Sequence, residues 1–405
     1  MDFTIERNTL LKPLGHIYSI VERRNTIPIL SNVLIETNSS KVSFTATDMD
    51  MDIVEVTGCV VFNQGKITLA AHTLYDIVRK LPDGAEIKIE LLDLNVQVSA
   101  GKSKFILPTL SVDDFPVMTE IEKGNEFSIE SVDLASLIDN TKFAISSEET
   151  RYYLNGIFFH VPEPNKDKLR AVATDGHRLA QAEIPLPEGA EAMPGIILPR
   201  KAVGEIRKLT DGTDGKIKII ISSTKARFTF PNSVLTTKLI DGSFPDYQRV
   251  IPKENLNKLT VLNSDFSKAI DRVSTVSMEK SRAVKLSLNK NLLSLNVNSH
   301  DLGNASEDLE INYNHDDLDI GFNAKYLLDI ASQIQGKEIC KTSLDVMIAF
   351  YNFREMCLKF TLEFLLHLRN IDSVYYVLLF FPCNRLRSTN ESIRSVLKTV
   401  KHAED

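Results

Sequence analysis

At 405 residues the chain is long for a single domain, and two to four domains are expected. Hydrophobic residues make up 43% of it and charged residues 25%, a composition typical of a soluble globular protein. The formal net charge of −7 excludes an overall basic coat of the histone kind, so binding to nucleic acid requires positive charge gathered on one face.

The first part of the chain alternates strands with helices. Phe3-Thr4-Ile5-Glu6 alternates apolar and polar residues, as a half-buried strand does. Apolar residues then recur at helical spacing from Leu10 to Val21. A second helix over 74–81 stops at Pro82-Asp83-Gly84. The remaining expected strands of this part are 29–35, 42–46, 87–91, 96–98 and 105–107.

The next part repeats the first in register. Phe127-Ser128-Ile129-Glu130 matches the first strand, and Ala173-Thr174-Asp175 matches Ala46-Thr47-Asp48. Two further matches are Arg207-Lys208-Leu209 with Arg79-Lys80-Leu81, and Phe244-Pro245 with Phe115-Pro116. Matches in the same order at several places indicate a duplicated domain rather than chance.

A third, fainter copy follows. Leu259, Phe266 and Ile270 take the places of Phe3, Leu10 and Leu14, and 327–330 repeats 74–77. We therefore predict an α+β fold of three similar domains in an arc, each a whole domain rather than a solenoid repeat. The expected boundaries are 1–123, 124–254 and 255–386, with the pattern lost after about residue 339 and an extra helix or tail over 387–405.

The polar faces of the expected helices carry cations. In an acidic protein, a basic lining on the helices with acidic residues elsewhere would hold a polyanion inside and repel it outside. The alternative is that these are ordinary solvated helix faces, but the Arg-Lys pair recurs at one position in two copies. The cations concerned are Lys12, Arg23, Arg24, Arg79, Lys80, Lys142, Lys201, Arg207, Lys208, Lys268, Arg272 and Lys325.

Asp175-Gly176-His177 suggests a hydrolase at first sight. The sequence contains no GxSxG, P-loop or HExxH motif and no paired carboxylates in a supporting context. We therefore expect no enzyme activity, no catalytic residue, no metal site and no cofactor. Taken alone, His177 is better explained as a structural histidine.

The four cysteines show no CxxC and no metal-ligand spacing, so free thiols in a reducing compartment are expected. The N-terminus lacks the basic and apolar regions of a secretion signal. The most apolar stretch, 357–381, is interrupted by charged residues, and no uncharged run reaches the length of a spanning helix. A cytoplasmic protein without membrane contact is the expectation.

Five segments together carry a specific resemblance that extends from Met1 to about Ile339. The segments are Arg24 to Leu34 (RNTIPILSNVL), Arg151 to Gly156 (RYYLNG), Ala173 to Leu179 (ATDGHRL), Leu198 to Lys201 (LPRK) and Asp241 to Val250 (DGSFPDYQRV). On these segments the chain resembles the beta-subunit family of bacterial DNA polymerase III, the sliding clamps.

The resemblance implies a ring-shaped homodimer that encircles double-stranded DNA, slides without sequence specificity and tethers the replicative polymerase. It also implies a pocket between the second and third domains for peptides of polymerase subunits, the clamp loader and repair polymerases. The positions that match this pocket are Leu154, Thr174, Gly176, His177, Arg178, Leu179, Pro245, Arg249 and Val250.

Two further sets follow from the resemblance and the charge pattern. The expected DNA-facing residues are Arg24, Arg79, Lys80, Arg151, Tyr152, Tyr153, Lys201, Arg207 and Lys208. Tyr152 and Tyr153 fall in an expected strand, which would turn neighbouring rings to opposite sides. The expected dimer contacts are Phe105 and Leu107 on one subunit with Thr275 and Val276 on the other, where the small, polar Thr275 predicts a weaker contact.

The C-terminal part departs from the family pattern. Residues 340–381 are rich in Phe, Leu and Tyr with poor alternation, and a polar segment, expected to be helical, runs from Asn390 to His402. A reading-frame change near Ile339 is our hypothesis for this replacement. It leaves an alternative open: a degenerate, monomeric relative that binds partner peptides without encircling DNA.

Overall fold

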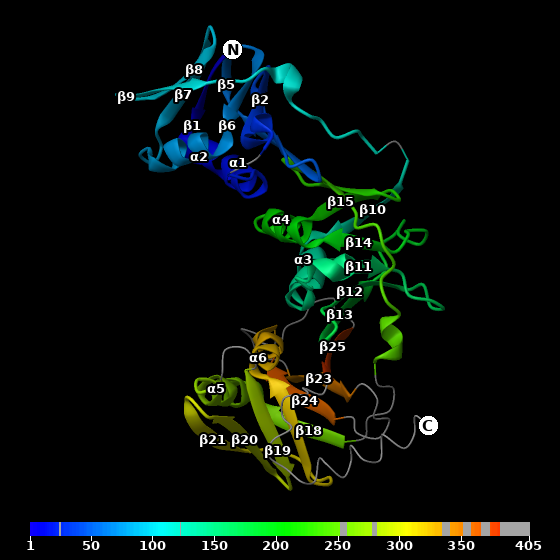
Figure 1. Cartoon of the computed structure of the whole chain (residues 1–405). Helices are drawn as coiled ribbons and strands as arrows, with labels where there is room; N and C mark the ends of the chain where they lie inside the picture. Colours follow the sequence, from blue (N-terminus) through cyan, green and yellow to red (C-terminus); the bar gives the residue numbers. More distant parts are fainter. Residues whose placement is uncertain are drawn as a thin grey trace. The chain divides into compact units, whose positions relative to one another are not determined.

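The computed structural model in Figure 1 describes residues 1–23, 26–121, 123–251, 257–277 and 282–333, and three strands after them. By their contacts, residues divide into two compact units. The first unit holds Met1–Asp175 and Leu179–Asp246, and the second holds Gly176–Arg178 and Tyr247–Leu365, each with part of the C-terminal segment.

The first domain follows the predicted order of strand, helix, strands, helix, strands. Its elements are β1 (Asp2–Glu6), α1 (Arg7–Ile20), the 3₁₀ turn η1 (Pro28–Ser31), β2 (Asn32–Asn38), β3 (Lys41–Thr47), β4 (Met51–Gly58), β5 (Val60–Asn63), β6 (Gly65–Ala70), α2 (Ala71–Lys80), β7 (Glu86–Leu92), β8 (Asn95–Ala100), β9 (Ser103–Pro108) and η2 (Val112–Asp114).

The second domain repeats this order. Its elements are β10 (Asn125–Glu130), α3 (Ser131–Asp139), η3 (Lys142–Ala144), η4 (Glu149–Leu154), β11 (Gly156–His160), β12 (Lys168–Thr174), β13 (Arg178–Pro185), β14 (Ile196–Pro199), α4 (Arg200–Thr210), β15 (Lys216–Ile221), β16 (Lys225–Thr229) and β17 (Ser233–Lys238), followed by η5 (Tyr247–Arg249).

The third domain keeps the pattern through its second helix. Its elements are β18 (Asn257–Leu262), α5 (Asn263–Ser274), β19 (Ala283–Asn289), β20 (Leu292–Ser299), β21 (Gly303–Glu310), β22 (Leu318–Asn323) and α6 (Ala324–Gln333). The C-terminal segment contributes β23 (Lys341–Phe350), β24 (Leu358–Leu365) and β25 (Ser373–Phe380). The helix or tail expected after residue 386 lies outside the described residues.

Local sequence explains where the helices begin and end. The Glu6 carboxylate accepts a hydrogen bond from the Thr9 backbone N–H at 2.8 Å and so caps the first turn of α1. After α2 and α4, Gly84 and Gly212 adopt φ values of +73° and +76°, a conformation that glycine enters without steric cost. The Asp-Gly stop signal therefore has the same structural basis in both copies.

The first unit contains the adjacent strands β14-β11-β12-β13 and two sheets made only of its own strands. One has the strand order β5-β1-β7-β8-β9, and β9 is its terminal strand. The other runs β10-β15-β16-β17-β4-β3-β2-β6 and joins the first two domains through the antiparallel pair β17–β4, in which Leu235 lies opposite Ile53. Both residues are fully buried, so the junction between these domains is part of the core.

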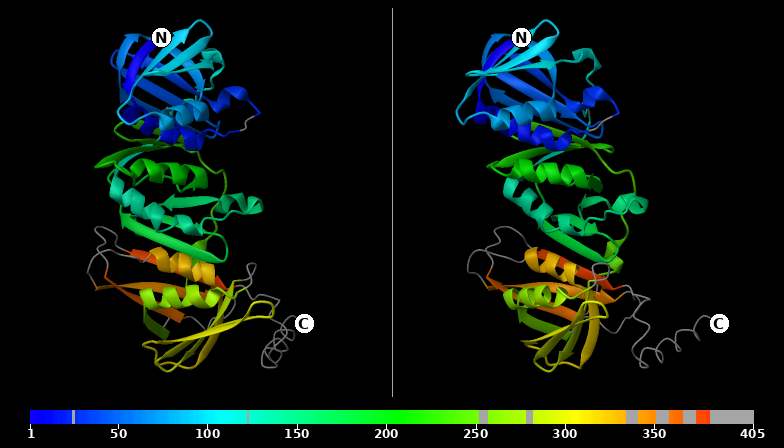
Figure 2. Two further views of the ribbon diagram at one scale, coloured as in Figure 1. Left: turned by 90° about the vertical axis from the view of Figure 1, so that its left-hand side faces the viewer. Right: turned by 60° about the vertical axis from the view of Figure 1, so that its left-hand side comes forward.

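The helices pair within each domain: α1 packs with α2, α3 with α4 and α5 with α6 (Figure 2). Their apolar faces carry fully buried residues such as Leu10 and Leu14 in α1 and Ile270 in α5. Because one face of each helix is buried, the polar residues lie on the opposite face. The predicted repeat of the helices is therefore present in all three domains.

The third domain differs from the others in its strand pairing. Its first strand, β18, pairs in parallel with β24, whereas β1–β7 and β10–β15 are antiparallel pairs. In the C-terminal segment, β23 also pairs in parallel with β25. The predicted change of pattern after residue 339 thus coincides with a change in sheet topology.

Candidate functional site

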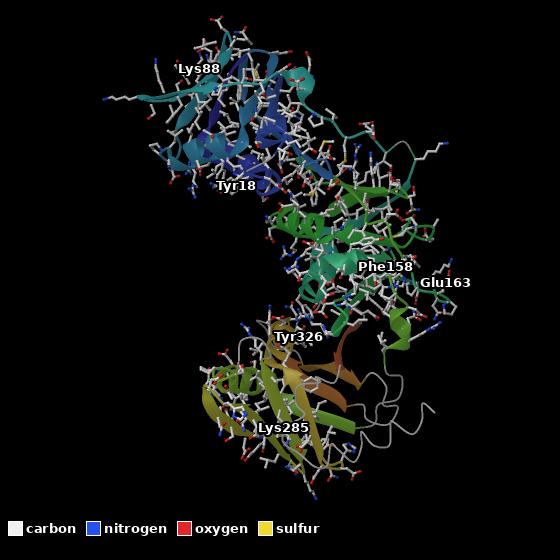
Figure 3. All side chains as sticks on the ribbon, in the orientation of Figure 1. Tyr18, Lys88, Phe158, Glu163, Lys285 and Tyr326 are labelled. Atoms are coloured by element: carbon white, nitrogen blue, oxygen red, sulfur yellow. The ribbon has the colours of Figure 1, made fainter. Side chains whose placement is uncertain are left out.

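An aromatic group lies between α1 and α2 of the first domain. The ring of Tyr18 is 4.4 Å from that of His72 and 4.6 Å from that of Tyr75, measured between centroids. The imidazole Nε2 of His72 lies 2.8 Å from the carbonyl oxygen of Val21, which ties the start of α2 to the end of α1. We call Tyr18, His72 and Tyr75 the aromatic shelf; Figure 3 labels Tyr18.

Two arginines lie over the aromatic shelf. The guanidinium of Arg23 is 5.6 Å from the centre of the Tyr18 ring and donates a hydrogen bond of 2.5 Å to the Tyr18 hydroxyl. The guanidinium of Arg79 is 5.7 Å from the centre of the Tyr75 ring, and its side chain is 56% exposed. Both distances are within the range of cation–π attraction.

The predicted cations at and near the end of α2 differ in their surroundings. Arg79 contacts the Asp76 carboxylate at 3.4 Å, longer than a strong charge-assisted hydrogen bond. Lys80, at the end of α2, is exposed. Arg24, a predicted DNA-facing residue, lies outside the described residues.

The cations of the second domain are paired closely with carboxylates. Arg207 Nε lies 2.7 Å from Asp139, and Arg207 also contacts Asp211. Lys142 shares Asp139, at 2.5 Å. Burial acts to lower the pKa of Arg207, but hydrogen bonds to Asp211 and Asp139 outweigh it, so this pKa is raised. Asp139 therefore holds two cations at the α3–α4 pair.

The two lysines of α4 follow the same rule. Lys208 lies 2.8 Å from Glu205, one helical turn away. Lys201 lies 2.5 Å from Asp48 and donates a hydrogen bond of 3.0 Å to the carbonyl oxygen of Ile20. Since Asp48 and Ile20 belong to the first domain, Lys201 also links the two domains of the first unit.

Among the predicted cations of the third domain, Arg272 is also paired with a carboxylate. Arg272 of α5 contacts both carboxylate oxygens of Glu307 on β21, one of them at 3.0 Å. This hydrogen bond lowers the pKa of Glu307. Lys268 and Lys325 are exposed on α5 and α6, as is Lys12 on α1.

The prediction that Tyr152 and Tyr153 lie in a strand is wrong. They belong to the 3₁₀ turn η4, which is kinked at Arg151 with φ −110° and ψ 53°. Their ring centroids are 5.8 Å apart in an edge arrangement, and Tyr152 is 54% exposed. Arg151 holds the turn by bonds to Glu148 at 2.8 Å and to the carbonyl oxygen of Asp175 at 3.2 Å.

The Ala173–Leu179 motif forms the turn between β12 and β13, where Thr174 lies opposite Leu179. Gly176 has φ +85°. The equivalent residue of the first copy, Met49, has φ +77°, and there Asp48 Oδ1 supports the turn by accepting hydrogen bonds from the N–H groups of Asp50 and Met51. The first two copies thus share the left-handed conformation at this position, and of these two the second meets it with glycine.

Gly176–Arg178 belongs by its contacts to the second unit, with α6. Arg178 is 7% exposed; its Nη1 lies 2.6 Å from Asp329, and its guanidinium lies 4.5 Å from the centre of the Tyr326 ring. His177 is exposed, with its ring 6.3 Å from that of Tyr326 (Figure 3 labels Tyr326). Arg178 is therefore held against α6 by an ion pair and a cation–π contact, while the side chain of His177 is exposed.

The other predicted pocket residues fall into two groups. In the first unit, Leu154, Thr174 and Leu179 are buried and Pro245 is exposed. In the second unit, Arg249 is exposed on η5 and Val250 is half-buried. Their assembly into one pocket stays a prediction.

The predicted dimer contacts lie at accessible positions. Phe105 and Leu107 are half-buried on the terminal strand β9, beside Ile106, which is 68% exposed. Thr275 is exposed and Val276 half-buried at the end of α5. Their contact across two subunits stays a prediction.

Sequence reasoning missed the aromatic shelf and the shared carboxylate Asp139. The signal for the shelf was His72 and Tyr75 at a spacing of three on the polar face of α2. The pairing of Asp139 with Lys142, three residues on, is local, but its pairing with Arg207 carried no comparable signal, because Arg207 lies on another helix. Among the described residues, no cluster of His, Cys, Asp and Glu could hold a metal ion. No helix in the described ranges is long and apolar enough to cross a membrane.

The threefold α+β repeat defines the class of this protein: it has the three-domain DNA clamp fold. Family models match it three times: the DNA polymerase III beta subunit N-terminal domain at residues 1–119, the central domain at 128–246 and the C-terminal domain at 248–345. The chain belongs to the DNA polymerase III beta subunit family.

Individual relatives agree with this assignment. The chain is 50% identical over 341 residues to the beta sliding clamp of Caulobacter vibrioides (strain NA1000), covering 84% of this chain and 92% of the relative. It is 36% identical over 343 residues to that of Escherichia coli K12, covering 84% and 92%.

Solved structures agree as well. The Bartonella birtlesii sliding clamp bound to griselimycin has a TM-score of 0.81 at 48% identity, covering 83% of this chain and 91% of that one. A Caulobacter crescentus beta sliding clamp has a TM-score of 0.79 at 50% identity, with the same coverage. The third family model matches no further than residue 345, close to the predicted change of pattern.

Proposed function

We propose that this protein is a DNA polymerase processivity factor. In this proposal it is a ring-shaped homodimer that encircles duplex DNA, slides along it without sequence specificity and tethers the replicative polymerase. The observation that carries the proposal is the match of all three domains to the sliding-clamp family, with relatives at up to 50% identity. This family acts by binding rather than by catalysis, so no enzyme activity is proposed.

The distribution of charge supports a sliding role. The chain is acidic overall, yet cations recur on the helix pairs of all three domains. A protein that neutralises many phosphates binds DNA tightly and with steep salt dependence. An enclosing ring needs no such grip, and the carboxylate-paired cations of the second domain fit a weak, mobile contact.

We assign the domain boundaries to residues 1–123, 124–254 and 255–386. The proposed subunit contact joins Phe105 and Leu107 of one copy to Thr275 and Val276 of the other. Terminal strands such as β9 readily pair with a second chain, which supports this choice. The rival is the monomeric relative that binds peptides without encircling DNA. Light scattering separates the two: the ring requires a dimer of twice 45.5 kDa.

The proposed peptide site takes short, extended segments of the polymerase, the clamp loader and repair polymerases in the cytoplasm. His177 is the residue to test, because its exposed ring can be removed without opening a core. His177→Ala should weaken binding of a clamp-motif peptide, measured by fluorescence anisotropy. Equal affinity of variant and wild type would contradict the assignment of His177 to the site.

The central experiment compares closed circular and linear DNA. The protein is loaded onto a nicked circle by a clamp loader, isolated by gel filtration, and the circle is then cut. Retention on the circle and rapid loss after linearisation would support encirclement, because only topology changes. Equal retention on both forms, or none on either, would contradict it.

A further inference from the structure

The outer edge of the first strand is covered in one copy of the repeat and open in the next. In the first domain, β5 pairs antiparallel with β1, and Phe3 lies opposite Val61. In the second domain, β10 takes the place of β1 and pairs with β15, but within the described residues it is the terminal strand of its sheet. The free edge of a terminal strand presents backbone N–H and C=O groups with which another chain can pair.

The sequence of the second copy explains this difference. The segment that corresponds to β5 begins at the end of β13 with Pro185 and Pro187, which have no N–H to donate to a neighbouring strand. It turns on itself instead, because the N–H of Ala190 donates to the carbonyl oxygen of Pro187 at 3.1 Å. Gly189 brings this turn against the start of β10: a Cβ at Gly189 would lie 2.8 Å from the carbonyl oxygen of Glu126.

A groove of about 550 Å³ lies along the remainder of this edge. That volume falls in the range of clefts that take ligands, about 300–1,000 Å³. Its apolar lining comes from Phe127 and Ile129 of β10 and from Ile184, Pro185 and Pro187. An extended peptide that adds to the edge of a sheet uses both features, because its backbone bonds to the strand and its side chains enter the neighbouring groove.

The groove is lined by more acidic than basic residues: Glu126, Glu130, Asp133 and Glu188 against Lys216. Within the described residues, Glu126 is paired with Lys218 at 2.7 Å, and the other three carboxylates make no ion pair. Burial, and after it the charge of Glu130, raise the pKa of Asp133 above its ordinary value. A cation in the groove would offset this repulsion between carboxylates, so basic side chains complement the groove.

We propose that the edge of β10 is a second docking site, which takes an extended, lysine- or arginine-rich segment of a partner protein as an added strand. The backbone of that segment bonds to the edge of β10, and its basic side chains meet Glu130, Asp133 and Glu188. The site goes beyond the proposed function, since it needs no closed ring and uses none of the residues assigned to the clamp-motif peptide.

The test measures binding of a short fluorescent peptide of alternating valine and lysine to the full-length protein, by anisotropy at low salt. Glu130→Gln and Glu188→Gln should each weaken binding by about threefold, the size of one exposed charge pair. Glu86→Gln is the matched control, because Glu86 is an exposed glutamate on β7 of the first domain, where β5 covers the sheet edge. The control should bind the peptide as the wild type does.

A second peptide separates strand addition from attraction by charge alone. It has the same sequence with methyl groups on its backbone nitrogens, so it keeps every positive charge but cannot donate backbone hydrogen bonds. Loss of these bonds should weaken binding by about tenfold. Thermal melting of each protein variant shows whether the fold is retained.

Three results would overturn this docking site: equal binding of the methylated peptide, an equal loss from Glu86→Gln, or no binding of the alternating peptide by the wild type. A mass in light scattering that rises when Glu130 and Glu188 are neutralised would assign the edge to a second copy of this chain and would also overturn it. None of these results depends on retention of the protein on circular DNA, so failure of the docking site and failure of the proposed function are distinguishable.

Discussion

The first and second domains carry the same Arg-Lys pair at the end of a helix, yet surround it differently. Arg79 lies over the ring of Tyr75 and contacts Asp76 at 3.4 Å. Arg207 lies 2.7 Å from Asp139 and also contacts Asp211. An aromatic ring attracts a cation without cancelling its charge, whereas a carboxylate cancels it. A repeated charge pattern therefore does not mean a repeated electrostatic surface.

The same contrast extends to the neighbouring lysines. Lys208 is paired with Glu205 at 2.8 Å, and Lys201 with Asp48 at 2.5 Å. In both pairs the lysine is exposed, whereas the side chain of the carboxylate is only 7% exposed in Glu205 and 11% in Asp48. A phosphate must therefore compete with a carboxylate that is already in place.

The largest expected effect is on duplex affinity, and it is tested by comparing Arg79→Ala with Arg207→Ala. Arg79→Ala should weaken duplex binding at low salt by about tenfold, the equivalent of one charge-assisted hydrogen bond of about 1.5 kcal/mol. Arg207→Ala should weaken it less, because the guanidinium of Arg207 is already paired with Asp139 and Asp211 and has fewer N–H groups left for a phosphate. Anisotropy titrations of both variants test this, and equal losses would remove the distinction between the domains.

The second prediction concerns stability and compares the equivalent turn positions Gly176 and Met49. Gly176→Ala should destabilise the protein by about 1 kcal/mol, because alanine is strained at φ +85°. Met49→Ala, at the equivalent φ of +77°, replaces one strained side chain by another and should cost much less. Urea unfolding of both variants measures the difference. A loss at Met49 as large as that at Gly176 would show that the two turns are not equivalent.

Removing a carboxylate should make the cations of the second domain bind DNA more as those of the first do. Asp139→Asn releases Lys142 and Arg207 from their shared partner and should tighten duplex binding by about threefold, with a steeper salt dependence. The melting temperature should change little, as is usual for surface pairs. Asp214→Asn, an exposed change of the same charge on the loop after α4, is the control. Unchanged binding by Asp139→Asn would mean that these cations do not meet DNA.

The smallest expected effect is on the pH dependence of stability, and it arises from His160 in the second domain. Burial, with the nearby charge of Arg170, lowers the pKa of His160 to about 4, below its ordinary value of 6.5. Between these values the unfolded chain binds more protons than the folded one, so stability falls as the pH drops from 6.5 towards 4. His160→Phe keeps an aromatic ring beside Phe158, 4.6 Å away in the wild type, but cannot be protonated.

Melting curves at pH 7 and pH 5 check this prediction. The wild type should lose more melting temperature between the two than His160→Phe does. His300→Gln, a change at an exposed histidine of the third domain, should behave as the wild type. Identical pH dependence of wild type and His160→Phe would show that His160 does not contribute to acid sensitivity.

The sequence alone determined the threefold repeat, the order of strands and helices, the Asp-Gly ends of α2 and α4, and the point at which the third copy departs. These features are local or periodic, so they are visible in the chain without its contacts. The resemblance to the clamp family, carried by contiguous segments such as Ala173–Leu179, was equally accessible.

Only the tertiary structure decided which partner each cation meets. Arg207 pairs with Asp139 and Tyr18 packs on Tyr75 across distances in sequence that no local pattern records. The 3₁₀ conformation of Tyr152 and Tyr153 was also hidden, because Arg151 fixes that turn through the distant carbonyl oxygen of Asp175. Periodicity specifies which face of a helix is polar, but the packing of separate helices determines whether a charge on that face is neutralised.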